Sequence, residues 1–137
     1  MSALCQAERM VRDGVETMMA TCMVAEPPRS GHSLVPTVLA NGACFDLVRV
    51  HSLQEAARAA EHVGHLTFAV VDDSVDNARA IVDMLSEAFP YCVIVFVSDF
   101  PITLHPSISV VPHDFPAGIA VAMRHGRAKA QRVALIK

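Results

Sequence analysis

The 137-residue sequence lacks any hydrophobic run that approaches the roughly 20 residues of a membrane-spanning helix. Charged residues make up only 18% of the chain and hydrophobic residues 53%, a balance that excludes disorder over most of its length. There is no excess of basic residues, since 11 Lys and Arg stand against 14 Asp and Glu, for a net charge of −3. We therefore expect no membrane contact, and nucleic-acid contact only through an output domain outside this sequence.

Cysteine and histidine patterns that signal a metal or redox centre are also scarce. The chain has four cysteines but no C-x-x-C spacing, so we expect reduced, mostly buried thiols in a cytoplasmic protein. Charged residues between Glu8 and Glu16 occupy the place where a signal peptide needs an apolar stretch, and secretion is not expected. Of the seven histidines, His62 and His65 are the closest pair, but without a third ligand nearby they do not predict a metal site.

Short apolar runs alternate along the chain with segments of helical periodicity. The runs predict five strands, at residues 22–25, 45–50, 66–71, 92–97 and 108–111. Helices are predicted at residues 3–22, about 33–41, 52–62, 75–89 and from 116 to 124 or beyond. Fully apolar strands that alternate with helices are typical of a parallel sheet covered on both faces. We predict an α/β fold with a five-stranded parallel sheet in the order 2-1-3-4-5.

The chain divides into three parts on this interpretation: an N-terminal amphipathic helix (1–21), an α/β domain (22–125) and a basic C-terminal tail (126–137). Five of the 11 basic residues lie at the C-terminal end with no acid among them: Arg124, Arg127, Lys129, Arg132 and Lys137.

The first predicted helix has an apolar stripe formed by Leu4, Val11, Val15, Met18 and Cys22. An isolated helix of this length is marginally stable in water, so the stripe must pack against another surface. We expect that surface to be the same helix of a second subunit, giving a homodimer. The alternative is that the helix folds over residues 100–107, where Pro101 and Pro106 exclude a regular helix.

Polar side chains follow three of the predicted strands directly. Glu26 follows the first strand, Asp72 and Asp73 the third, and Ser98 and Asp99 the fourth, while Pro112 and His113 follow the fifth. Ligands of open α/β sheets bind beyond the carboxyl ends of the strands, where these groups would meet. Such an acidic pocket suits Mg²⁺ and an aspartate nucleophile for phosphoryl transfer. The alternative is that the acids are loop residues and helix caps, with Asp73 or Ser74 capping the helix that starts near residue 75.

Residues 22–125 resemble the receiver domain of two-component response regulators in strand order and spacing. Phe68–Asp72 is similar to the third strand, which ends in the phospho-acceptor aspartate. Val93–Ser98 is similar to the fourth strand with its phosphoryl-contacting hydroxyl, Met23–Glu26 to the first strand with its metal-binding acid, and Ile108–Pro112 to the fifth strand.

This resemblance implies a flavodoxin-like fold and a role in a phosphorelay. It implies phospho-acceptor candidates at Asp72 and Asp73, a phosphoryl contact at Ser98, and candidate Mg²⁺ ligands at Glu26 and Asp72. It also implies that the partner is a sensor kinase or an output domain.

Several departures from the receiver pattern indicate a degenerate receiver, or pseudo-receiver. Pro27 follows Glu26 where receivers have a second acid, and Val111 stands where receivers have a lysine before the fifth-strand proline. The only lysines, Lys129 and Lys137, are too far along the chain to replace it, so the phosphoryl group would lack its main cation. Ser109 stands at the aromatic switch position of receivers.

Three functions remain open at this point. The first is a receiver-like signalling module that acts mainly through protein–protein contacts, with phosphorylation weak or absent and no enzymatic activity. The second is a conventional Mg²⁺-dependent receiver phosphorylated at Asp72 or Asp73. The third is a flavodoxin-like domain that binds a small ligand. The sequence has no G-K-[ST] loop and no G-x-G-x-x-G, so it carries no nucleotide-binding motif of these types. It has no G-x-S-x-G motif of a hydrolase either.

Overall fold

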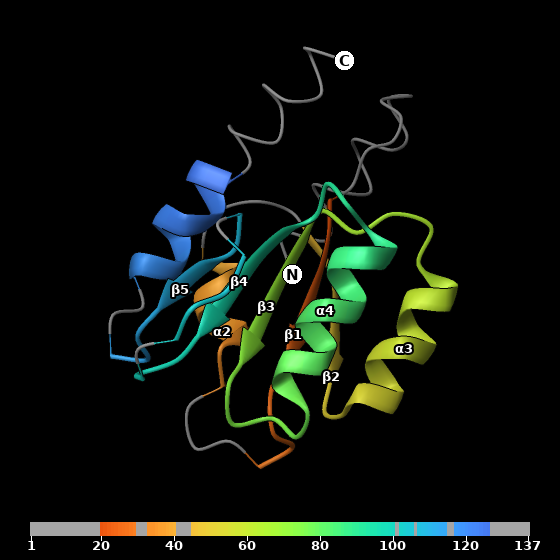
Figure 1. Cartoon of the computed structure of the whole chain (residues 1–137). Coiled ribbons are helices and arrows are strands. Elements are labelled where there is room, and N and C mark those ends of the chain that lie inside the picture. The colour runs from red at the N-terminus through yellow and green to blue at the C-terminus, as the bar shows by residue number, and fades with distance from the viewer. Residues whose placement is uncertain are drawn as a thin grey trace, which may run out of the picture.

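The fold is an α/β sandwich built on one parallel sheet (Figure 1). A computed structural model describes residues 20–29, 33–40, 45–100, 102–105, 107–114 and 117–126. Its strands are β1 (Ala20–Ala25), β2 (Phe45–Val50), β3 (Phe68–Asp72), β4 (Val93–Val97) and β5 (Ser109–Val111). Its helices are α2 (Val35–Leu39), α3 (Leu53–His62) and α4 (Ala78–Ala88), and residues 117–126 are also helical. No helix within these described ranges is long and apolar enough to cross a membrane.

The strand order is β2-β1-β3-β4-β5, and every pairing between neighbours is parallel. This confirms the predicted five-stranded sheet and its order. The central strands β3 and β4 are buried at every position. Their uninterrupted apolar sequences follow from that position, because a strand in the middle of a parallel sheet is covered on both faces.

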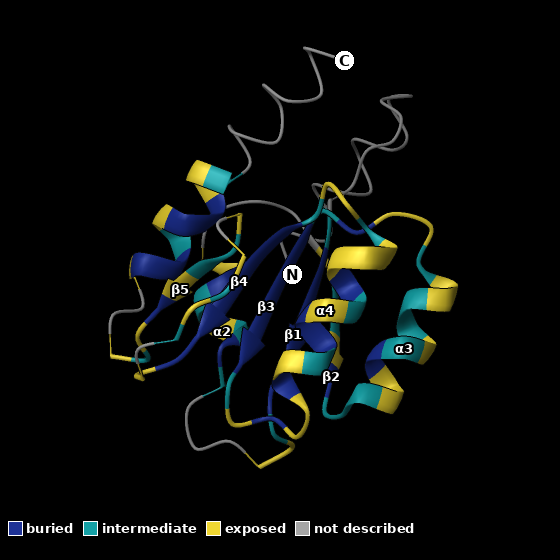
Figure 2. Ribbon diagram, viewed as in Figure 1, coloured by how far each residue is buried: buried dark blue, intermediate teal, exposed yellow. Residues whose placement is uncertain are grey.

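Successive side chains of each strand point to opposite faces, and two separate hydrophobic cores result (Figure 2). On one face, Val70 and Val95 pack with Val38 of α2 and with Ile119 of the C-terminal helix. We call the other side of the sheet the α4 face. It buries Ala69, Ile94 and Phe96 under α3 and α4, which contribute residues such as Ala56, Ile81 and Leu85.

The predicted helix 3–22 is wrong at its C-terminal end. Residues 20–22 belong to β1, which pairs with β2 along its full length from Ala20 to Ala25. Cys22 is fully buried in the sheet rather than on a helix stripe. Pairing with two neighbouring strands satisfies the backbone of this buried segment, so it overrides the helical periodicity. The first strand therefore begins at residue 20 instead of 22, and the remainder of the predicted helix lies outside the described residues.

The predicted start of α3 is confirmed, with one change in its hydrogen bonding. Ser52 is the N-cap, and its hydroxyl accepts a hydrogen bond from the Glu55 N–H at 3.1 Å. The Glu55 carboxylate accepts a hydrogen bond at 2.7 Å from the N–H of His51, one residue before the position expected in a capping box. Both bonds satisfy backbone donors at the junction of β2 and α3, and they set where the helix begins.

The start of α4 differs from the prediction. Neither Asp73 nor Ser74 caps the helix, which begins at Ala78 with Asn77 as its N-cap residue. The reason is the side chain of Asp72, whose Oδ1 accepts hydrogen bonds from both the N–H and the hydroxyl of Ser74. These bonds favour a turn directly after β3, and the helix starts only after Asn77, whose φ of 61° lies in the left-handed region.

The connection from β4 to β5 contains no helix in its described residues, 98–100, 102–105 and 107–108. The loop predicted around Pro101 and Pro106 is therefore confirmed where it can be followed. The connections to β2, β3 and β4 contain α2, α3 and α4 respectively, so α3 and α4 cover the α4 face, and the described residues of the β4–β5 connection add no third helix there.

Candidate functional site

The ends of β1, β3, β4 and β5 lie at one edge of the sheet. Ala25 pairs with Val71, Asp72 pairs with Val97, and Val97 pairs with Val111. The residues that follow these strands are therefore neighbours, and they include three buried polar side chains: Glu26, Asp72 and Ser98. Burial of a carboxylate is costly unless hydrogen bonds or opposite charges compensate it, so the partners of each group define the chemistry of this edge.

Glu26 is fully buried, and its carboxylate faces α2 and β2. Its Oε2 accepts hydrogen bonds from Ser33 Oγ and from Arg49 Nε, both at 2.6 Å. Its Oε1 accepts one from the N–H of Leu34 at 2.7 Å, at the start of α2. The Arg49 guanidinium neutralises the charge, and the other two bonds satisfy the remaining acceptors. Through these hydrogen bonds Glu26 connects the end of β1 to β2 and to the start of α2.

Asp72 is the last residue of β3, and only 3% of it is exposed. Its Oδ1 lies 3.0 Å from Nε2 of His113, which follows β5. The same oxygen accepts the two hydrogen bonds from Ser74. Asp72 therefore has its partner within the protein, and the protonated form of His113 neutralises its charge.

A hydrogen bond from the backbone of His113 to the side chain of Asp99 fixes the position of His113. The His113 N–H donates a hydrogen bond to Asp99 Oδ1 at 2.7 Å. Its Nδ1 lies 3.1 Å from Asp99 Oδ2, in an ion-pair contact whose geometry does not make a hydrogen bond. Nε2 also lies 3.8 Å from Oδ1 of Asp73. One imidazole thus stands among three carboxylates, those of Asp72, Asp73 and Asp99.

Asp73 and Ser98 form a direct pair at the same edge. The Ser98 hydroxyl donates a hydrogen bond to Asp73 Oδ2 at 2.7 Å and accepts one from the N–H of Phe100 at 3.2 Å. The side chain of Asp73 is 21% exposed, against 4% for Asp72. The serine is thus paired with the more accessible of the two aspartates, and a hollow of about 690 Å³ lined by Asp73, Ser98 and Phe100 opens beside them.

The ionisation of the Asp72–His113 pair follows from these contacts. Burial raises the pKa of Asp72, but hydrogen bonds from the Ser74 N–H, His113 and the Ser74 hydroxyl outweigh it and hold the pKa below its ordinary value. Burial lowers the pKa of His113, but the hydrogen bond and charge of Asp72, and then the charge of Asp99, raise it above its ordinary value. Both shifts favour the charged pair.

The site fits Mg²⁺ poorly. Within the described residues, one ligand atom each from Asp72, Asp73 and His113 lie within 4.8 Å of one another, and Glu26 is not among them. An imidazole is a poor ligand for Mg²⁺, which prefers oxygen. Of the two predicted ligands, Glu26 is committed to Arg49 and Asp72 is committed to His113. The carboxylates that the sequence suggested as a metal pair are instead neutralised by internal cations.

His113 is the strand-end residue to which the sequence analysis assigned no role. The expectation was that the missing lysine leaves the site without a cation, because no other lysine is near. The structure places a histidine there, two residues after Val111. The available signal was its position directly after Pro112 at the end of β5, at the same edge as the other strand ends.

The fold is that of a response-regulator receiver domain. The sequence matches no protein-family model and no curated protein. Among solved structures, a response regulator receiver domain protein from Bacillus halodurans C-125 is similar, with a TM-score of 0.60 and 11% sequence identity. The alignment covers 80% of this chain and 97% of that one. At this identity the similarity establishes the receiver-like fold, and the function must be argued from the site.

Proposed function

We propose that this chain is a receiver-like signal-transduction module that acts mainly through protein–protein contacts, with Mg²⁺-dependent phosphorylation weak or absent. The observation that carries this proposal is the internal neutralisation of both predicted metal ligands, Glu26 by Arg49 and Asp72 by His113. A divalent ion would have to displace these cations, each of which makes a charge-assisted hydrogen bond worth about 1.5–3 kcal/mol. Its partner on this proposal is a sensor kinase or an output domain in the cytoplasm.

A conventional phospho-accepting receiver is the second candidate, and one observation favours it. Asp73 is partly exposed, is paired with the Ser98 hydroxyl, and has His113 Nε2 3.8 Å from its Oδ1. A carboxylate, a hydroxyl and a cation at one point could accept and contact a phosphoryl group. Asp73 is then a better acceptor candidate than Asp72, whose oxygen Oδ1 is fully engaged.

The two candidates differ in their response to phosphoryl donors and mimics. With acetyl phosphate and Mg²⁺, the proposal predicts that the intact chain shows no stoichiometric label by mass spectrometry. With beryllofluoride and Mg²⁺, it predicts no shift of the melting temperature, because a ligand that does not bind the native state cannot stabilise it. Stoichiometric labelling of either Asp72 or Asp73 would overturn the proposal and establish the conventional receiver.

A matched pair of variants tests the physical reason. His113→Asn removes the internal cation from Asp72, and we expect Mg²⁺ to bind this variant more tightly than the wild-type chain. His105→Asn changes an exposed histidine that lies in the β4–β5 connection and contacts Ser107. Its Mg²⁺ affinity is expected to equal that of the wild-type chain. Equal affinity in all three proteins would show that His113 does not exclude the ion.

A further inference from the structure

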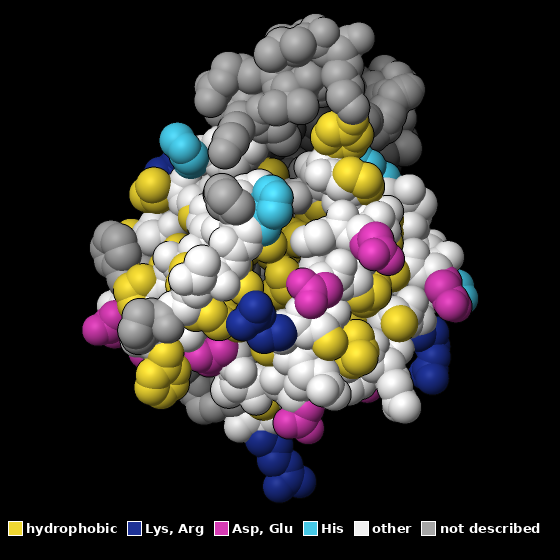
Figure 3. Space-filling model, viewed as in Figure 1, with side chains coloured by type: hydrophobic (Ala, Val, Ile, Leu, Met, Phe, Trp, Pro, Cys, Tyr) yellow, Lys and Arg dark blue, Asp and Glu magenta, His cyan; other side chains and the backbone are white. Residues whose placement is uncertain are grey.

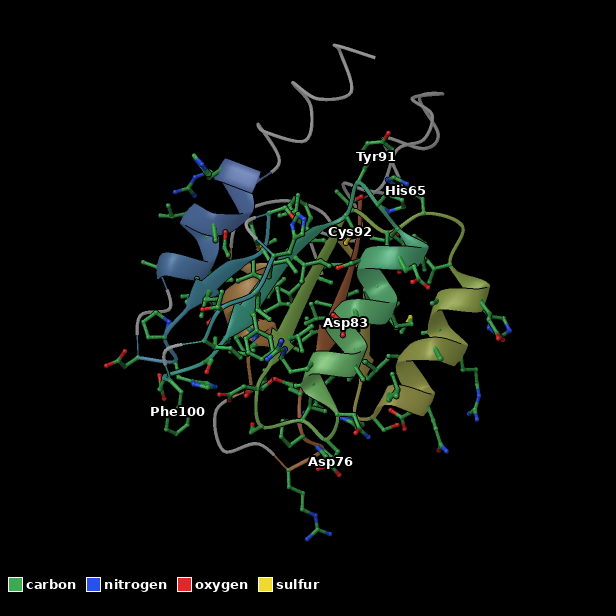
Figure 4. The ribbon with its side chains drawn as sticks, viewed as in Figure 1. His65, Asp76, Asp83, Tyr91, Cys92 and Phe100 are labelled. Carbon is green, nitrogen blue, oxygen red and sulfur yellow. The ribbon has the colours of Figure 1, made fainter. Side chains whose placement is uncertain are left out.

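A hollow of about 760 Å³ opens on the α4 face between α4 and the β4–β5 connection. Its lining includes Val82, Asp83 and Glu87 of α4, Ile94 of β4, and Leu104 and Ile108 of the connection, and we call it the α4 groove. In Figure 3 hydrophobic side chains lie at the bottom of this hollow, with acidic side chains along the edge formed by α4. Figure 4 places Asp83 on α4 and Cys92 near the start of β4.

The groove lies between α4 and the β4–β5 connection, whose described residues form no helix. Val82 and Ile94 are buried, but Leu104 and Ile108, which belong to the same core, are only partly covered. A parallel sheet is stable when both of its faces are covered, and here the cover beside β4 is a loop. The groove is therefore an incompletely covered part of the hydrophobic core, with the apolar floor expected of a surface that receives an amphipathic helix.

The sequence carries one helix that has an apolar stripe and no assigned surface. Residues 3–17 place Leu4, Val11 and Val15 on one side at helical spacing. A helix over residues 3–17 would be about 22 Å long, enough to run beside the 11 residues of α4. Such a helix is marginal in water and needs an apolar partner surface.

The N-terminal segment joins the sheet close to the end of the groove. It leads into β1 at Ala20, and next to this point Thr67 N–H donates a hydrogen bond to the carbonyl of Thr21 at 3.0 Å. The Val93 N–H donates to the carbonyl of Thr67 at 2.9 Å, and Cys92, the residue before Val93, lines the groove. Two neighbouring-strand spacings of about 4.8 Å each separate β1 from β4, and the three Cα–Cα steps from Thr17 to Ala20 span about 10 Å when extended, so a helix that ends at Thr17 can reach the groove within one chain.

We propose that the N-terminal helix, residues 3–17 of the same chain, occupies the α4 groove and takes the place of a helix that the described residues of the β4–β5 connection do not form. Burial of its apolar stripe on the floor of the groove would cover both surfaces at once. This inference goes beyond the proposed function and does not depend on it. The competing occupant is the same helix of a second copy, which was the expectation from the sequence.

The first experiment disrupts the stripe and follows amide hydrogen exchange in the intact chain. Val11→Asp combined with Val15→Asp places two charges on the stripe. We expect the amides of residues 102–108 to exchange at least about tenfold faster, while the β3 amides remain protected. The matched control is Gln6→Asp with Thr17→Asp, which adds the same charge on the side away from the stripe and is expected to leave exchange unchanged. Equal exchange in both variants would overturn the proposal.

The second experiment distinguishes one chain from two. In a chain with Cys5→Ser, Cys44→Ser and Cys92→Ser, the substitutions Val15→Cys and Ser86→Cys, the second at an exposed position of α4 that lines the groove, are joined by a short bifunctional maleimide. We expect a cross-link within one chain and a light-scattering mass equal to the 14.7 kDa of the monomer. Thr17→Cys is the control that should cross-link at least about tenfold less. A cross-link between chains with twice the mass, or no difference between Val15→Cys and Thr17→Cys, would overturn the proposal.

Discussion

The behaviour of His113 is the main residue-scale feature of this protein. A neutral histidine in contact with Asp72 would leave a buried carboxylate without its cation, so the protonated form is stabilised in the native state. The contact between Asp72 and His113 contributes to both the lowered pKa of Asp72 and the raised pKa of His113, together with hydrogen bonds from Ser74 to Asp72 and the charge of Asp99 near His113. A folded-state pKa that differs from the unfolded one makes the stability depend on pH.

The sign of that dependence can be predicted. The contribution of His113 is complete below its unfolded pKa of 6.5 and is lost as the pH rises through the raised folded value. The contribution of Asp72 is present above 3.8 and is lost as the pH falls through the lowered folded value. In His113→Gln we expect a lower free energy of unfolding at about pH 6, and a flatter dependence from about pH 6 to 8. Urea unfolding at a series of pH values checks this, and parallel profiles for the two proteins would contradict it.

Asn77 is the second informative residue, because its φ of 61° is left-handed. Asparagine tolerates this conformation, whereas a β-branched residue does not. Asn77→Val is expected to lower the free energy of unfolding by about 1–2 kcal/mol. Asn77→Gly, which relieves the backbone requirement, should stay within about 0.5 kcal/mol of the wild type. Thermal unfolding of both variants measures this, and equal losses would mean that the side chain matters more than the backbone.

At the scale of elements, the contact between the C-terminal helix and β4 limits which residues can be accommodated. Gly126 is the last described residue of the helix at residues 117–126, and a Cβ atom there would lie 2.5 Å from Val93 Cγ1. Val93 is itself buried between the helix and the sheet and is stiff at χ1, so it has little freedom to move away. The glycine allows the helix to pack closely against the start of β4.

Gly126→Ala is therefore expected to destabilise the protein, although alanine is the better helix former by about 1 kcal/mol. Overpacking at this contact should outweigh that gain and leave a net loss of about 1–2 kcal/mol. Gly64→Ala is the control, because a Cβ atom there has no neighbour within 4 Å. We expect it to be neutral or slightly stabilising in denaturant unfolding. A stabilised Gly126→Ala protein would show that the helix end can move away from Val93.

For the molecule as a whole, the question is how the α4 face is completed. The sheet has one face closed by α2 and the C-terminal helix, and the α4 face carries the groove beside β4. If the N-terminal helix fills that groove, its removal exposes apolar surface without changing the number of chains. If the helix joins two subunits, its removal separates them.

Deletion of residues 1–19 tests this at the level of the molecule. We expect the shortened chain to remain monomeric, and its free energy of unfolding to fall by about 2 kcal/mol or more through the loss of apolar burial. Light scattering before and after deletion, combined with thermal unfolding, gives both quantities. A mass that halves on deletion would instead establish the dimer.

The sequence by itself determined the architecture of the described chain. The apolar runs of β3 and β4 and the stripe of α4 predicted a parallel sheet and its order, because burial on both faces imposes a composition that is visible locally. Ser52 and Glu55 indicated the start of α3, because the hydrogen bonds of a helix cap join residues that are close in the sequence. The positions of Glu26, Asp72 and Ser98 at strand ends could also be predicted from the sequence.

Only the tertiary structure decided what those polar groups do. Arg49 is 23 residues from Glu26, and His113 is 41 residues from Asp72, so no local pattern links either cation to its acid. The extent of β1 was likewise decided by pairing with β2 and β3, which overrode the helical periodicity of Ala20–Cys22. Local signals determine which elements form, whereas charge neutralisation and strand ends depend on neighbours that the fold brings together from distant parts of the chain.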